Sequence, residues 1–355
     1  MTNYKVPSMK EIEAIPWNGF NVCSTFSGGG GSCLGYRMAG YRVLYANEFV
    51  EEAQKTYKAN HPNSYLDTRD IREVSGQDIL DIIGLEKGQL DVFDGSPPCC
   101  AFSTAGKREA GWGQAREYSD GKKQVIDDLF FEYARLIKEI QPKVFIAENV
   151  SGLAKGKAKG YLKLIYNELK NCGYNVSVKI INAKFFGVPQ SRERTIFIGV
   201  RNDLKLEPKY PKPNKRLVTL REAFNGLEQD EEQAQWLEER IVGYAIGKEL
   251  KKLQKNPNKR QQSDKYFNLS RESMNKPSST ICAEHGKSGT AGICHPLYDR
   301  KFTIPEVKRI MSIPDDFILT GAYAKQWERL GRMVPPLMMK AISETVYQEI
   351  LCKIK

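Results

Sequence analysis

Strand-like and helical segments alternate along the first half of this 355-residue chain. Apolar and β-branched runs predict strands, in chain order, at 21–26, 41–46, 90–94, 144–147, 175–181 and 194–200. Helical periodicity predicts the intervening helices at 33–39, 49–59, 127–140 and 160–171. This alternation favours the α/β class, with a mainly parallel sheet covered by helices.

A glycine-rich segment, Gly28 to Gly31, follows the first strand and opens the first helix. Such a turn lets backbone amides and a helix N-terminus approach an anionic group. Glu48 lies about 20 residues later at the end of the next strand, where a carboxylate binds ribose hydroxyls. The glycine spacing does not fit the dinucleotide fingerprint, so we expect a different nucleoside-containing cofactor, with a flexible loop as the alternative. Asp70-Ile71 is a candidate to read an adenine edge, or else a surface turn.

The segment Gly95-Ser96-Pro97-Pro98-Cys99 ends the strand at 90–94. Two prolines fix the backbone and remove two donors, so the thiol that follows them is held on a stiff support. The carboxyl ends of strands in open α/β sheets are where ligands bind. Cys99 is therefore a candidate nucleophile, and the alternative is a loop cysteine after a tight turn.

The formal net charge of +11 predicts a polyanionic partner, of which nucleic acid is the commonest. A basic surface kept for solubility is the alternative interpretation. Cations outnumber acids from Lys248 to Lys276, and Lys107 and Arg108 belong to a basic segment after Cys99. That segment is typical of a lid that meets phosphates.

Eight cysteines are scattered without a Cys-x-x-Cys pair, and the chain has three histidines. No zinc or other metal site is expected from this pattern, which fits reduced thiols in a cytoplasm. The chain shows neither a secretory signal nor an apolar run long enough to span a membrane. We therefore expect a soluble cytoplasmic protein.

The glycine loop and the Pro-Pro-Cys segment are followed in the chain by three more short motifs: Glu148-Asn149-Val150, Gln190-Ser191-Arg192-Glu193-Arg194 and Gly331-Arg332-Met333-Val334-Pro335-Pro336. In content and order these motifs resemble those of the DNA (cytosine-5) methyltransferase family of bacterial and phage type, over nearly the whole chain. The resemblance implies a Rossmann-like S-adenosylmethionine-dependent methyltransferase sheet with a small target-recognition domain. It also implies that S-adenosylmethionine is bound by Phe26, Ser27, Gly28, Gly30, Gly31, Glu48, Asp70, Ile71, Pro97, Arg332 and Val334.

The same resemblance assigns the catalytic groups to motifs at three strand ends. Cys99 adds to cytosine C6, which makes C5 nucleophilic enough to accept a methyl group. Glu148, in the triplet Glu148-Asn149-Val150, holds the N3 and amino edge of the base. Arg194 donates to the base O2, and Arg192 supports it or contacts a phosphate. Without the other motifs, the alternative interpretation is that Glu148 caps a helix or forms a salt bridge and that Arg192 and Arg194 form surface ion pairs.

The target cytosine lies inside a duplex, so the resemblance implies base flipping, with residues 103–124 as the wedge. Residues expected to bind double-stranded DNA are Ser103, Lys107, Arg108, Trp112 and Gln190. The predicted catalytic domain spans 1–200 and 326–355, the latter mostly an amphipathic helix, and the small target-recognition domain spans 201–325. We expect a monomer that is associated with the nucleoid of a bacterial or phage-infected cell.

Two positions depart from the family pattern. Cys100 replaces the usual glutamine, and Arg332 replaces the usual asparagine near the methyl-donating end of the cofactor. Arg332 either pairs with an acid or a DNA phosphate, or accepts an anionic donor. Because guanidinium and carboxylate match bidentately, carboxy-S-adenosylmethionine and transfer of a carboxymethyl group form an alternative.

Three other functions compete with DNA methylation. A transfer-RNA cytosine-5 methyltransferase shares the catalytic motifs, but its expected Cys-Phe-Thr signature is absent between residues 200 and 300. A catalytically silent DNA-binding relative conflicts with the intact set of Cys99, Glu148 and Arg194. An NAD-dependent oxidoreductase is disfavoured by the glycine spacing. The target sequence and any paired restriction enzyme cannot be read from the chain.

Overall fold

The computed structural model describes residues 4–98, 116–117, 123–124, 128–155 and 158–354. The chain forms two compact units. The sheet unit comprises 14–181, 193–212 and 339–355, and the small unit comprises 1–13, 182–192 and 213–338. Within the described ranges, no helix is both long and apolar enough to cross a membrane.

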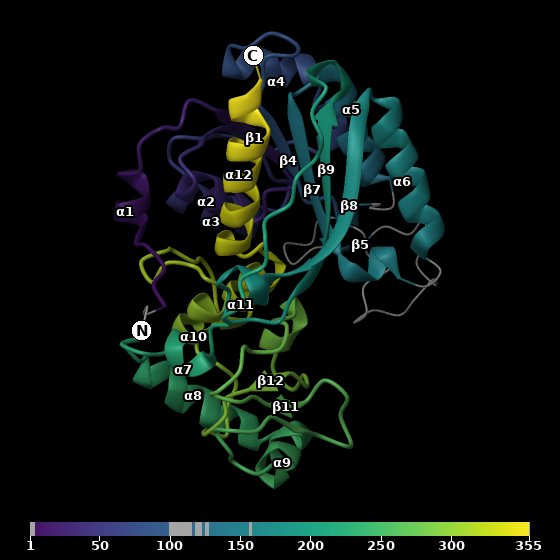
Figure 1. The fold of residues 1–355 in the computed structure, drawn as a ribbon. Helices are drawn as coiled ribbons and strands as arrows, with labels where there is room; N and C mark the ends of the chain where they lie inside the picture. The colour runs from purple at the N-terminus through teal and green to yellow at the C-terminus, as the bar shows by residue number, and fades with distance from the viewer. Residues whose placement is uncertain (1–3, 99–115, 118–122, 125–127, 156–157, 355) are drawn as a thin grey trace. The chain divides into compact units, whose positions relative to one another are not determined.

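The sheet unit is built on a seven-stranded sheet with the order β3-β2-β1-β4-β7-β9-β8 (Figure 1). Neighbouring strands from β3 to β7 pair in parallel, whereas β9 runs antiparallel to β7. The predicted mainly parallel sheet is therefore confirmed. Its strands are β1 Asn21–Thr25, β2 Arg42–Asn47, β3 Tyr65–Asp67, β4 Val92–Gly95, β7 Val144–Val150, β8 Tyr174–Asn182 and β9 Glu193–Arg201. A separate antiparallel pair is formed by β5 Arg116–Glu117 and β6 Lys123–Gln124.

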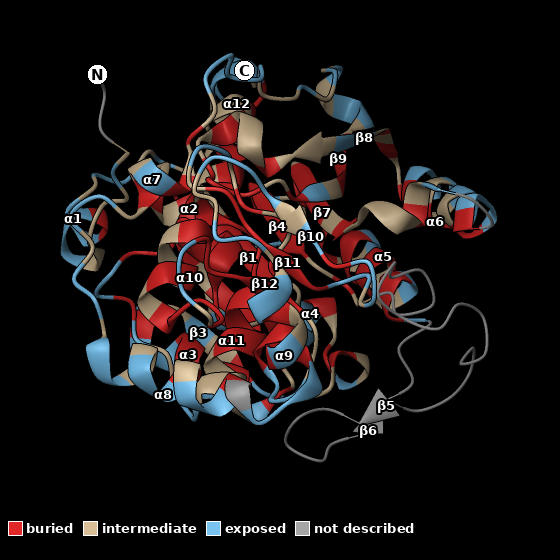
Figure 2. Ribbon diagram, turned by 90° about the horizontal axis from the view of Figure 1, so that it is seen from below, coloured by how far each residue is buried: buried red, intermediate tan, exposed pale blue. Residues whose placement is uncertain are grey.

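Helices lie on both faces of this sheet, with α4, α5 and α6 on one side and α2, α3 and α12 on the other (Figure 1). Phe93 and Phe145 pack with Ile137 of α5 and Ile165 of α6 in one buried cluster. Alternate strand residues face opposite sides, and the central strands are buried on both faces (Figure 2). Most of the buried strand side chains are apolar, but polar ones such as Ser24 and Asp94 are among them. The helices are α2 Gly31–Met38, α3 Glu51–Asn60, α4 Gly76–Ile83, α5 Leu129–Ile140, α6 Lys159–Asn171 and α12 Pro336–Glu349, with short 3-10 turns η1 Ile71–Glu73, η3 Ser151–Ala154, η6 Asn202–Leu204 and η8 Leu351–Lys353.

Strand register brings the chemistry-bearing turns to one edge of the sheet. Thr25 at the end of β1 is paired with Gly95 at the end of β4, and Gly95 with Ala147 of β7. Arg194 near the start of antiparallel β9 is opposite Val150 at the end of β7. A side chain at Gly95 would place its Cβ 2.4 Å from the Tyr133 ring, so the close approach of α5 requires glycine here.

The small unit combines short helices with a three-stranded sheet of order β10-β11-β12. Arg271 of β11 is fully buried, and its guanidinium donates to the carbonyls of Leu250, His295 and Tyr298 and pairs with Asp299. Its elements are α1 Met9–Glu13, η5 Ala183–Phe186, α7 Leu220–Ala223, α8 Glu231–Val242, α9 Ala245–Lys252, β10 Gln261–Gln262, β11 Ser270–Arg271, η7 Ala283–Gly286, β12 Ile293–Cys294, α10 Ile304–Ile310 and α11 Tyr323–Arg332.

The predicted helix over 326–355 is wrong as a single element. The structure has α11 and α12, separated at Met333–Pro335, because Pro335 and Pro336 each lack the backbone donor that a continuous helix needs. The two compact units also do not coincide with the predicted domains: 1–13, 182–192 and 326–338 belong to the small unit, and 201–212 belongs to the sheet unit.

Candidate active site

The glycine loop begins with a strained turn directly after β1. Phe26 has φ 54, Gly28 has φ 56 and Gly30 has φ 92. A bulky residue rarely adopts the left-handed region, so the surroundings must hold Phe26 there. The Ser27 amide donates to the Asn47 carbonyl at 3.0 Å, which fixes this turn against the end of β2. The chain then enters α2 at Gly31 with its first amides at the end of the loop.

Glu48 fastens this loop to the start of α3. One carboxylate oxygen accepts from the Gly28 amide at 2.7 Å, and the other accepts from the Val50 amide at 2.7 Å. The residue is 8% exposed. Each carboxylate oxygen can accept a second hydrogen bond, so Glu48 can hold the loop and still meet a ribose hydroxyl.

His61 lies beneath the loop and was not singled out from the sequence. Its ring stacks on Tyr57 at a centroid distance of 4.5 Å, and a Cβ at Gly30 would fall 2.2 Å from its Nε2. Burial and the Arg37 guanidinium lower the pKa of His61 to about 3, so the ring is neutral at physiological pH. The ring and the glycine therefore leave no room for a side chain at this point of the loop.

Asp70 and Ile71 adopt the conformation of a capped turn. The Asp70 carboxylate accepts from the Arg72 amide at 3.1 Å and pairs with the Arg72 guanidinium at 3.4 Å. The Ile71 side chain is 2% exposed and packs into the cluster beneath the sheet. Their proposed contact with adenine stays a prediction.

Asp94 is a buried carboxyl that sequence reasoning missed, five residues before Cys99. It accepts from the Ser24 hydroxyl at 2.9 Å and from the Tyr36 hydroxyl at 3.1 Å. The Ser27 hydroxyl in turn lies 3.2 Å from the Ser24 hydroxyl, so hydrogen bonds run from β4 to the glycine loop. Burial raises the pKa of Asp94 to about 7, against the opposing effect of these hydroxyl donors.

The raised pKa of Asp94 predicts a pH-dependent stability. The unfolded carboxyl ionises near its ordinary pKa, and the folded one only near 7, so folding stability contributed by this group falls as pH rises from about 4 to about 7. Asp94→Asn should remove this fall. In urea unfolding, the unfolding free energy of the variant relative to that of the wild type should therefore increase as pH rises. Asp203→Asn is a control of opposite sign, because Arg201 lowers the pKa of Asp203. Parallel pH profiles for wild type and Asp94→Asn would contradict the assignment.

Glu148 and Arg194 meet at the end of the β7–β9 pair. The Arg194 Nε lies 2.6 Å from Glu148 Oε1, and each side chain is 12% exposed. The neighbouring Asn149 is buried and donates from its amide to the Pro97 carbonyl at 3.0 Å. The Glu-Asn-Val triplet is thereby tied to the Pro-Pro turn, and the ion pair stands beside that tie.

The predicted nucleophile and several predicted DNA contacts lie outside the described residues. These are Cys99, Ser103, Lys107, Arg108 and Trp112. The described part of the nucleophile motif ends at Pro98, with Pro97 buried.

Arg192 and Gln190 make hydrogen bonds to other residues of the small unit. The Arg192 guanidinium is 2% exposed and donates to the carbonyls of Ile281, Gly331 and Met333 at 2.9, 2.8 and 3.2 Å. Gln190 is fully buried, and its side-chain oxygen accepts from the Ile281 amide at 3.1 Å. Both side chains are buried, and the expected roles of Arg192, in support of Arg194 or on a phosphate, and of Gln190 on DNA stay predictions.

Arg192 should therefore matter for stability. Arg192→Met leaves three buried carbonyls without this donor, and we expect a loss of about 2–5 kcal/mol in unfolding free energy, read as a lower urea midpoint. Arg221→Met, at an exposed position of α7, is the matched control and should change stability by less than about 0.5 kcal/mol. Normal stability with weakened DNA binding in Arg192→Met would contradict this structural role and favour the phosphate contact.

Arg332 is paired with an acid, as one of the two alternatives expected. Its guanidinium lies 2.9 Å from Glu328 Oε1, one helical turn earlier in α11, and its side chain is 47% exposed. Arg329 contacts the same carboxylate oxygen at 3.0 Å. Val334, which follows α11, is 4% exposed.

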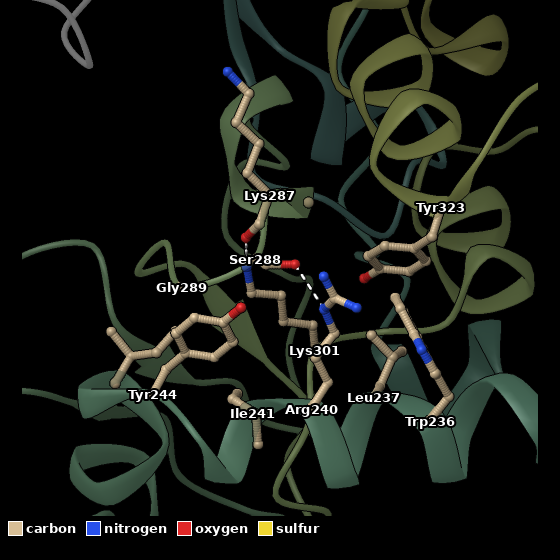
Figure 3. A pocket seen from close by; sticks show the side chains of 12 residues that line it. Trp236, Leu237, Arg240, Ile241, Tyr244, Lys287, Ser288, Gly289, Lys301 and Tyr323 are labelled. Atoms are coloured by element: carbon tan, nitrogen blue, oxygen red, sulfur yellow. Dashed lines mark hydrogen bonds between the residues drawn. The ribbon is translucent and has the colours of Figure 1, made fainter.

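A further pocket in the small unit contains none of the residues predicted from the sequence. It has an empty volume of about 330 Å³ and lies between α8, the segment 286–289 and α11 (Figure 3). The Arg240 guanidinium stacks on Trp236 and donates to the Ser288 hydroxyl at 2.8 Å. Lys287 and Lys301 also line the pocket. Lys287 pairs with Glu284, and the Lys301 ammonium donates to the carbonyls of His285 and Lys287, so all three cations of the lining have partners within the chain.

Comparison with known proteins supports one family over almost the whole chain. A family model described as C-5 cytosine-specific DNA methylase matches residues 20–348. The type II methyltransferase M.DdeI of Desulfomicrobium norvegicum is 30% identical, over 92% of this chain and 88% of its own length. The type II methyltransferase M.PspPI of Psychrobacter sp. is 31% identical, over 95% of this chain and 81% of its own length.

Solved structures show the same fold at lower identity. A DNA modification methyltransferase encoded within an E. coli prophage superimposes with a TM-score of 0.71 at 22% identity, covering 94% of this chain and 99% of its own. DNMT2 of Spodoptera frugiperda superimposes with a TM-score of 0.64 at 19% identity, covering 92% and 98%. The chain therefore belongs to the C-5 cytosine-specific DNA methylase family, and it is a DNA cytosine-5 methyltransferase that uses S-adenosylmethionine as its methyl donor.

Proposed function

We propose that the protein methylates cytosine in double-stranded DNA through Cys99, as the modification enzyme of a type II restriction–modification pair. The observation that carries the chemistry is the Glu148–Arg194 ion pair, at the same sheet edge as the Pro-Pro turn. The type II assignment is supported by the relatives, which are named as type II methyltransferases. A cytoplasmic location accords with this role.

The glycine loop and Glu48 fit a nucleoside-containing cofactor. Gly30 presents bare backbone above His61, and Glu48 supplies a buried acceptor at the end of β2. S-adenosylmethionine, when bound, supplies the methyl group. In this proposal Glu48 receives the ribose hydroxyls, while Phe26 and Gly28 shape the wall of the site.

The proposed reaction divides the work among three side chains. The Cys99 thiolate forms a bond to C6, and the C5–C6 π electrons move into the ring toward N3. Glu148 holds the proton at N3, and Arg194 holds Glu148 in place and donates to O2. After methylation of C5, loss of the C5 proton to solvent re-forms the double bond and expels the Cys99 sulfur. Asn149 keeps the Pro-Pro turn beside Glu148 through its bond to Pro97.

A covalent trap tests these roles. Fluorine at C5 cannot leave as a proton, so duplex DNA of random sequence with 5-fluorocytosine should form a denaturation-resistant adduct with the wild type and S-adenosylmethionine. Cys99→Ser should form none, while Cys100→Ser should still form it. Glu148→Gln should slow adduct formation by about 10²–10⁴-fold. An adduct that survives in Cys99→Ser would exclude Cys99 as the nucleophile, and one formed on RNA in place of DNA would overturn the DNA substrate.

The ion pair of Arg332 with Glu328 favours methyl over carboxymethyl transfer. The glutamate already compensates the guanidinium charge that would have to attract a donor carboxylate. We expect mass analysis of modified DNA to show 5-methylcytosine with S-adenosylmethionine and no carboxymethylcytosine with carboxy-S-adenosylmethionine. Arg332→Asn should leave that preference unchanged and shift stability by less than about 1 kcal/mol. Carboxymethylcytosine made by the wild type and lost in Arg332→Asn would reverse this conclusion.

A further inference from the structure

Phe267 is an aromatic side chain that the fold leaves in solvent. It is 91% exposed, in the connection between the antiparallel strands β10 and β11 of the small unit. Two nearby apolar residues of the same turn are instead packed into the small unit. Leu269 is fully buried in a cluster with Ile241 and Leu250, and Tyr266 packs against the same cluster.

Hydrogen bonds hold the backbone around this ring. The Ser263 hydroxyl accepts from the amides of Lys265 and Tyr266, both at 3.1 Å. The Ser263 amide donates to the Leu269 carbonyl at 2.9 Å. The Gln262 side-chain amide donates to the Phe267 carbonyl at 2.6 Å and to the Leu269 carbonyl at 2.9 Å. The turn is thus fixed on both sides of Phe267, while its ring projects outward.

A fixed and exposed ring is suited to binding another molecule. Burying a phenylalanine side chain is favourable, so a well-ordered turn that leaves one in water forgoes stabilisation within the chain. The ordered backbone also reduces the entropy that is lost when the ring makes a contact. Single exposed apolar residues are common, so the identity of the partner must come from the surroundings.

The surroundings are cationic. Lys265 is exposed in the same turn, and Lys259 and Arg260 are exposed directly before β10. The acids nearby are Asp264 in the turn, Glu249, which accepts from the Ser263 hydroxyl, and Glu272, which pairs with Arg260 at 3.2 Å. Lys259 and Lys265 are therefore the cations on which the proposal rests. The Arg260 guanidinium donates to the Gln262 side-chain oxygen at 2.7 Å, which places it next to the amide that holds Phe267. A polyanion that also offers flat apolar faces matches this combination, and nucleic acid has both features.

We propose that Phe267 is a DNA-contacting residue, whose ring stacks on a base while Lys259 and Lys265 neutralise adjacent phosphates. The ring contributes apolar contact, and the lysines contribute attraction that depends on salt. The proposal goes beyond the catalytic roles given above. It rests on DNA as the substrate and does not depend on Cys99, Glu148 or Arg194.

Binding of the full-length protein to a short fluorescein-labelled duplex of random sequence tests the ring. We expect Phe267→Ala to raise Kd by about 5- to 100-fold, the usual range for loss of one base stack. Ile318→Ala is the matched control, because Ile318 is 54% exposed in the same unit but follows Asp315 and Asp316. An unchanged Kd in Phe267→Ala, or equal losses in the two variants, would overturn the proposal.

Salt dependence separates the ring from the lysines. The slope of log Kd against log salt should stay the same in Phe267→Ala, because the ring releases no counterions. Lys259→Ala and Lys265→Ala should each reduce the slope by about 0.9 if each lysine neutralises a phosphate of duplex DNA. Unchanged slopes in both lysine variants would exclude the phosphate contacts.

A fluorescence readout distinguishes stacking from a structural role of the turn. In Phe267→Trp, duplex DNA should quench the added tryptophan emission relative to the wild type, whereas Ile318→Trp should show no added quenching. The alternative partner for the Phe267 ring is a second copy of this chain. Sedimentation of the protein without DNA tests this alternative by measuring whether it dimerises. A concentration-dependent dimer that is lost in Phe267→Ala, without any effect of DNA on the Phe267→Trp emission, would replace DNA by self-association.

Discussion

Parallel pairing of β1, β4 and β7 is the constraint on which the candidate site depends. Because these strands run in one direction, the turn after each leaves the sheet at one edge. The glycine loop follows β1, the Pro-Pro turn follows β4, and the Glu-Asn-Val triplet forms the end of β7. Gly95 sets how closely the middle strand approaches α5, since any side chain there would collide with Tyr133. Chain segments far apart in sequence therefore end at the same edge of the sheet.

Buried charge is used differently in the two units. In the sheet unit, the carboxylates of Glu48 and Asp94 accept hydrogen bonds that fix the glycine loop. In the small unit, the guanidinium groups of Arg192 and Arg271 donate to carbonyls of several segments that lack long regular elements. A buried polar group is costly without partners, so each one specifies the arrangement of the backbone around it. Arginine suits this work because one planar group satisfies several acceptors.

The sequence predicted the sheet well because strand composition and helical periodicity repeat over most of the sheet unit. It failed at the C-terminal helix, where the apolar period runs through Pro335 and Pro336 although the backbone hydrogen bonds cannot. The motif around Arg192 and Arg194 shows a second limit. Both arginines suit a base or a phosphate chemically, but Arg194 pairs with Glu148 and Arg192 is buried among carbonyls. Residue type alone does not show which way a side chain points.

The sheet unit is assembled from three stretches of chain, and the last of them contributes most of α12. The hydroxyl of Tyr41, near the start of β2, donates to the carbonyl of Ser343 in that helix at 2.9 Å. During translation, residues 213–338 of the small unit leave the ribosome before this helical stretch does. The face of the sheet that α12 covers therefore remains uncovered by this helix while more than a hundred intervening residues are synthesised. Chaperone occupancy of the nascent chain should be concentrated in that interval.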